Sequence, residues 1–107
     1  MKTVRIMNEY LHGPIWVYGS DGVSIRQYPL IHGDAVLMTL NEKAADMFDA
    51  YYEFDTNDVP CWFNYEKERT EKDAMLTLIE RMVARLNEIN DGSFVIEDLE
   101  SERLRAL

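Results

Sequence analysis

The sequence predicts an α+β fold in which an antiparallel N-terminal sheet of three to four strands packs on two long antiparallel helices. Three observations predict it. Segments rich in β-branched and aromatic residues occur within residues 3–31, apolar residues then recur every three or four positions over 37–51, and they do so again over 75–89, within a stretch from 65 to 90 that favours a helix. Strands grouped first and helices grouped second are typical of this class. The 107 residues contain no linker or repeat, so we expect one domain over 1–107.

The first third of the chain predicts three strands, over Thr3–Met7, Ile15–Tyr18 and Val23–Tyr28. Gly19 and Gly22 supply the positive φ that a four-residue hairpin loop needs between the second and third strands. Pro29 has no N–H to donate, so the third strand is expected to end there or to lie at an edge. Residues 93–96 predict a short additional strand that can join the sheet.

The first long helix is predicted over residues 35–53, with Asp34 as its N-cap. An alternative makes residues 35–40 a strand and begins a shorter helix at Asn41. The long helix is favoured because Ala, Leu and Met dominate this stretch. Four acids fall opposite its apolar stripe and are interpreted as a solvated face rather than a dimetal site: Glu42, Asp46, Asp49 and Glu53.

The second long helix is predicted from Tyr65 to Asn90, with Asp91-Gly92 ending it, and residues 98–107 predict a short helical tail. Leu78 widens its apolar face beyond the stripe of about 100° that suits a one-sided surface helix. The helix is therefore expected to pack on two surfaces. Both can lie within the domain, or one can belong to a second subunit in a homodimer. The candidate partner interface is Met75, Leu78, Met82 and Ile89.

The chain is strongly acidic, with 20 Asp and Glu against 11 Lys and Arg and a formal net charge of −9. Such a surface repels phosphate backbones, so we expect no nucleic-acid partner. The lone Cys61 and the absence of an apolar leader or a long apolar run predict a cytoplasmic protein without a membrane partner.

Aromatic residues are concentrated between residues 48 and 65, where seven of the 12 lie. One interpretation is a groove for a peptide or small ligand lined by Tyr52, Trp62 and Tyr65. The other is that the rings seal the end of a helical hairpin against the sheet, which is the more common use of such clusters.

The remaining polar motifs predict no metal site, no cofactor and no catalytic residue. Asp55, Asn57 and Glu66 fit three positions of a calcium loop, but Pro60 stands where that loop needs glycine. His12, His32 and Cys61 are reactive residue types, yet nothing in their spacing brings them together.

These patterns predict a small acidic soluble protein that acts as a non-catalytic protein–protein interaction or regulatory module. The alternative is a small-ligand-binding domain or minor enzyme with a pocket near residues 52–65 and His12 or His32 as its polar group. A second alternative is a nucleic-acid mimic that binds a basic partner through its acidic second half.

Overall fold

The computed structural model describes residues 1–56 and 59–107 and has the predicted α+β class. The described residues form one three-stranded sheet, a separate two-stranded sheet and five helices. In chain order the elements are β1 (Lys2–Ile6), β2 (Ile15–Tyr18), α1 (Pro29–His32), α2 (Ala35–Asp49), β3 (Tyr52–Thr56), β4 (Val59–Phe63), α3 (Tyr65–Thr70), α4 (Lys72–Ile89), β5 (Phe94–Asp98) and α5 (Glu100–Arg105).

The main sheet has the strand order β2-β1-β5 and is mixed, so the prediction of an antiparallel sheet is wrong in part. β1 and β2 pair antiparallel with Ile6 opposite Ile15, whereas β5 pairs parallel to β1 with Phe94 opposite Lys2. A parallel neighbour needs a long crossover connection. The helices between β2 and β5 supply that crossover. The residue types at 93–96 indicate a strand but do not indicate its partner or its direction in the sheet.

The third predicted strand, Val23–Tyr28, does not form. A turn forms at Gly19–Gly22, but only Gly22 has the expected positive φ, at +80, and only an isolated bridge between Tyr18 and Ser24 follows it. The chain then enters α1, with Pro29 in the first turn of that helix. The N–H groups in the first turn of a helix have no hydrogen-bond partner within that helix, so the missing N–H of proline loses no hydrogen bond there. The residue that was expected to end a strand therefore begins a helix.

Helix α2 confirms the helical interpretation of residues 35–40, and the strand alternative is wrong. Asp34 caps it as predicted, because its side chain accepts a 2.8 Å hydrogen bond from the Leu37 N–H. The same carboxylate binds Arg85 of α4, with 2.6 Å between Oδ2 and Nη2. The helix ends at Asp49, not at residue 53, because the chain from Tyr52 onward pairs with β4.

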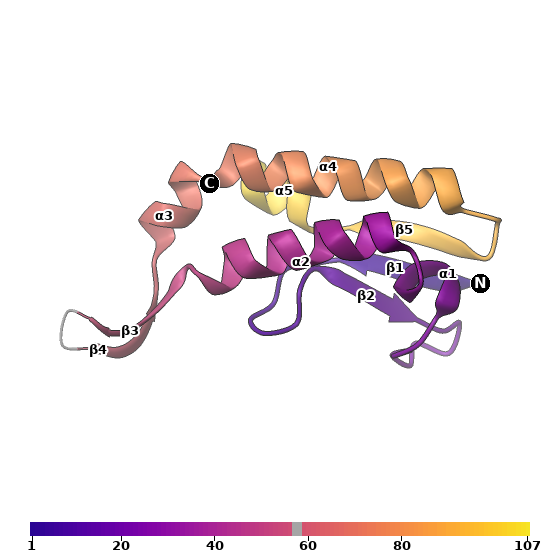
Figure 1. Ribbon diagram of the computed structural model, residues 1–107, viewed down its shortest axis with the longest axis horizontal. Helices are drawn as coiled ribbons and strands as arrows, with labels where there is room; N and C mark the ends of the chain where they lie inside the picture. Colours follow the sequence, from indigo (N-terminus) through magenta and orange to yellow (C-terminus); the bar gives the residue numbers. More distant parts are fainter. Residues whose placement is uncertain (57–58) are drawn as a thin grey trace.

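The second predicted helix is divided at Glu71 into α3 and α4. Figure 1 shows α2 and α4 running side by side in opposite directions, with the main sheet against the pair. Two long helices are therefore too simple a description, because short helices are added at both ends of this pair.

The core lies between the main sheet and the α2–α4 pair. Four residues of α4 at helical spacing are buried in it, Met75, Ile79, Met82 and Leu86. The sheet contributes Val4, Ile6, Val17 and Phe94. No helix among the described residues is long and apolar enough to cross a membrane.

Candidate functional site

The β3–β4 hairpin extends from one end of the body as a ribbon of its own (Figure 1). Tyr52 pairs with Phe63 and Glu53 with Trp62. Paired residues share a face of a sheet, and successive residues alternate between faces. Trp62 therefore lies on the face opposite to Tyr52. Tyr52, Trp62 and Tyr65 therefore do not line the single groove that we expected. That expectation did not include the alternation of faces along a β-strand, which separates Trp62 from Tyr52.

The base of the hairpin is fixed to the body by aromatic packing around Phe63. The centroid of its ring is 5.7 Å from that of Phe48, 5.8 Å from Tyr51, 5.0 Å from Tyr52 and 4.8 Å from Tyr65. The Asn64 N–H also donates to the Tyr51 carbonyl at 2.6 Å. The rings around Phe63 thus pack against the body, in agreement with the sealing interpretation. They attach a β-hairpin to the body and do not close the end of a helical hairpin.

A pocket of about 310 Å³ opens beside this base, and we call it the hairpin pocket. Its aromatic wall consists of Phe48, Tyr52, Phe63 and Tyr65, and its polar side includes Asn8, Glu68, Glu100 and Arg103. It therefore contains Tyr52 and Tyr65 of the predicted ligand site. The carboxylates are a feature that sequence reasoning missed, because Glu68 and Glu100 belong to different helices and resemble ordinary surface acids.

The polar side of the hairpin pocket is an ion cluster that carries more negative than positive charge. Glu68 and Glu100 are 1% and 2% exposed. Nη2 of Arg103 lies 2.6 Å from Oε2 of Glu68 and 3.0 Å from Oε2 of Glu100. One guanidinium thus faces two carboxylates. The Asn8 Nδ2 donates to Glu100 at 3.3 Å, while its buried Oδ1 has no hydrogen-bond partner.

Tyr51 lies in the core behind this cluster. Its hydroxyl is buried and has no hydrogen-bond partner. Burial raises the pKa of Tyr51 to about 12, and the negative charges of Glu71 and Glu68 add to the effect.

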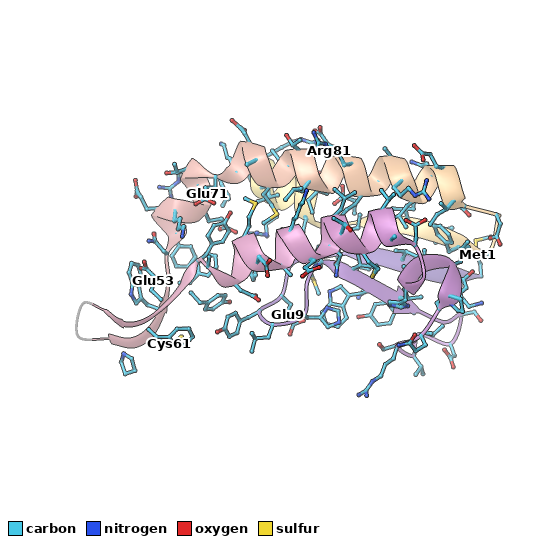
Figure 2. All side chains as sticks on the ribbon, viewed as in Figure 1. Met1, Glu9, Glu53, Cys61, Glu71 and Arg81 are labelled. Carbon is cyan, nitrogen blue, oxygen red and sulfur yellow. The ribbon has the colours of Figure 1, made fainter. Side chains whose placement is uncertain are left out.

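Two rings are exposed at and beside the hairpin, that of Phe54 on β3 and that of Tyr65, the first residue of α3. Phe54 is 52% exposed and Tyr65 is 68% exposed. Figure 2 shows Glu53 and Cys61 on this ribbon, away from the α2–α4 pair. The stretch from residue 48 to 66 contains five acidic residues and no basic one.

The predicted partner interface on the second helix is divided between core and surface. Met75 and Met82 are fully buried within the chain, while Leu78 and Ile89 are partly buried at its edge. The interface prediction now rests on the latter two. Leu78 lines an open groove of about 520 Å³ between α2 and α4, together with Met47 and Arg81; Figure 2 shows Arg81 on the outer side of α4.

His12 and His32 lie together in a second pocket of about 430 Å³ beside β2, which we call the histidine pocket. Their convergence could not be read from the sequence, because twenty residues separate them and the loop after β2 brings them together. Cys61 is exposed on the hairpin and lines neither pocket.

The other predicted polar motifs give no metal site in the part of the chain that is described. No group of three or more His, Cys, Asp or Glu side chains within residues 1–56 and 59–107 is placed to hold an ion. Asn57 of the partial calcium loop lies outside the described residues. On the acidic face of α2, Asp49 accepts a 3.0 Å hydrogen bond from the Leu11 N–H.

Comparisons with protein-family models, with curated proteins and with solved structures found no match to this chain.

Proposed function

We propose that this chain is a non-catalytic interaction module that binds a basic, extended segment of another protein through the β3–β4 hairpin and the hairpin pocket. The observation that carries the proposal is an acidic two-stranded ribbon with Phe54 exposed on it and Tyr65 exposed beside it, next to a pocket whose ion cluster has an excess of negative charge.

The backbone of the hairpin favours an extended partner. No third strand pairs with β3 or β4 within the described residues, so each strand has one unpaired row of N–H and C=O groups. A two-stranded hairpin alone is marginally stable in water. An added strand would satisfy one of these rows, which is a common mode of peptide recognition.

Charge favours a basic partner over a second copy of the chain. Two acidic residues, Glu53 and Asp55, belong to β3, so pairing two hairpins edge to edge through this strand would bring acidic residues of one copy next to those of the other. Like charges directly opposite in a sheet destabilise the pairing, whereas lysine or arginine on an incoming strand would stabilise it.

The hairpin pocket suits the head group of a lysine or arginine from that segment. An aromatic ring attracts a cation placed over its face, by about 0.5–2 kcal/mol. Tyr52 and Tyr65 offer such faces, and the carboxylates of Glu68 and Glu100 outnumber the guanidinium of Arg103 beside them. A bound cation would balance the charge of this cluster.

The test is binding of a fluorescent peptide of alternating valine and lysine, followed by anisotropy at physiological salt. The matched probes are the same peptide with glutamate for lysine, and the lysine peptide with alternate backbone nitrogens methylated. We expect the lysine peptide alone to bind, because methylation removes the N–H donors of the added strand. Binding of all three peptides, or of none, would contradict the proposal.

Two variants locate the site. Tyr65→Ala should weaken binding about tenfold, because a ring at the pocket mouth is lost. Glu53→Gln should weaken it less, and its control is Glu80→Gln, which removes an equal charge from an exposed position on α4. If Glu80→Gln has the same effect as Glu53→Gln, the binding reflects net charge and not the hairpin.

The same assay separates this proposal from the nucleic-acid mimic. A mimic would bind basic partners through the exposed acids of its second half, without strand pairing. In that case the N-methylated lysine peptide would bind as well as the unmodified one.

A further inference from the structure

The histidine pocket differs in charge from the rest of this acidic chain. Its polar lining residues are His12, Ser24, Arg26, His32 and Asn41, with Trp16 on one wall, and no carboxylate is among the lining residues. Ile15, Val17, Ile25 and Met38 supply the apolar part. A concave site of about 430 Å³ with a few converging polar groups on an apolar wall has the size and character of a small-molecule site.

The hydrogen bonds of the two histidines fix which ring nitrogens are free. Nδ1 of His12 lies 2.9 Å from the Gly13 carbonyl and must carry the proton to donate to it. Nδ1 of His32 accepts from the Tyr28 N–H at 2.9 Å, so the proton of its neutral ring is on Nε2. His32 therefore has an Nε2–H donor available.

A flat surface lies at the same place. The rings of His12 and Trp16 are stacked, with centroids 3.5 Å apart and planes at 6°. The indole N–H donates to the Met7 carbonyl at 2.9 Å, which fixes the orientation of Trp16. The wall is thus in place before any ligand binds, and little side-chain ordering is needed on binding.

The pocket is also bordered by an outer strand of the main sheet. β2 is at the edge of that sheet. Two contacts protect its outer backbone: the Ile15 N–H donates to Asn41 Oδ1 at 3.0 Å, and Val17 O accepts from the Ile25 N–H at 2.7 Å. The first contact holds β2 against α2, the second holds Ile25, the neighbour of Arg26, against β2, and both oppose addition of another strand here.

We propose that the histidine pocket binds a small organic anion, a carboxylate or phosphate attached to a flat ring. Arg26, the His32 Nε2–H and the Ser24 hydroxyl hold the oxyanion, and the ring lies on the wall formed by Trp16 and the apolar residues. The guanidinium is suited to either oxyanion because its N–H groups bind two oxygens at once. This site is separate from the hairpin and does not depend on its function.

The experiment is an NMR titration of the whole chain, following the histidine ring and Trp16 indole signals. The probes are benzoate, phenyl phosphate, inorganic phosphate and benzylamine. We expect benzoate or phenyl phosphate to bind with a dissociation constant of about 1 mM or tighter. The preferred one of the two identifies the oxyanion. Inorganic phosphate should bind more weakly because it has no ring, and benzylamine should not bind because its charge is opposite.

Arg26→Gln should weaken binding about tenfold without changing the fold, since Arg26 is exposed. Arg105→Gln on α5 removes the same charge at another exposed position and should leave binding unchanged. Binding of benzylamine equal to that of benzoate, equal loss in both variants, or no shift of the histidine signals with any probe would overturn the proposal.

Discussion

Of the side chains in the ion cluster at the hairpin pocket, Arg103 should contribute most to the free energy of unfolding. Its Nη2 bridges Glu68 of α3 and Glu100 of α5, and its Nε lies 3.2 Å from Oε2 of Glu100. The substitution Arg103→Met removes the charge but retains most of the apolar stem. It leaves two carboxylates, each no more than 2% exposed, without this cation.

The expected loss of unfolding free energy follows from burial. Removing one partner of a buried ion pair costs about 3–5 kcal/mol. The Arg103 side chain is itself 41% exposed, so water partly replaces it, and we expect a value of about 3 kcal/mol. The whole free energy of unfolding of a chain of 107 residues is about 5–15 kcal/mol. The variant therefore loses a substantial share of its stability, and its urea midpoint should fall by about 1–3 M.

The assay is urea unfolding followed by circular dichroism at near-neutral pH. The control is Arg105→Met, which changes an exposed arginine on the same helix and should alter stability by less than about 0.5 kcal/mol. Adding Glu68→Gln and Glu100→Gln to Arg103→Met should restore at least half of the loss, because neutral amides are less costly to bury than charges. A loss below about 1 kcal/mol, or no recovery in the triple variant, would show that the carboxylates do not need this arginine.

Three further predictions concern other parts of the fold. Tyr51→Phe should raise stability by about 1 kcal/mol in urea unfolding, because it removes a buried hydroxyl that has no partner; a loss above 1 kcal/mol would contradict this. The hydrogen bond from Arg85 holds the pKa of Asp34 below its usual value, so this carboxylate stabilises the fold above about pH 4 and the contribution disappears as pH falls through its folded pKa. Asp34→Asn keeps a capping oxygen, and thermal unfolding against pH should then show a shallower loss at acid pH than in the parent chain. If the predicted homodimer forms through the second helix, sedimentation should show a dimer that Leu78→Glu converts to monomer; a parent chain that is monomeric at micromolar concentration would refute that interface.

The sequence alone determined those parts of the fold that depend on local periodicity. The spacing of Leu37, Leu40, Ala44 and Phe48 is sufficient for a helix, and all four side chains are buried in α2. Asp34 caps that helix because the capping hydrogen bond needs only a short polar side chain and the next three residues. Ile15–Tyr18 forms a strand with the predicted bounds for the same reason, since its residue types favour extended backbone.

The tertiary structure alone decided which strands pair and which polar side chains meet. The apolar periodicity predicts a helix through residue 53, but residues 52 and 53 lie in β3 because β4 pairs with them. Residues 23–28 have strand-forming types but find no partner strand, apart from one bridge at Ser24. Glu68 and Arg103 are 35 residues apart in the chain. His12 and His32 line the same pocket because the loop after β2 brings them together. Backbone pairing and charge contacts between such distant segments depend on the path of the whole chain, and short-range periodicity contains no information about that path.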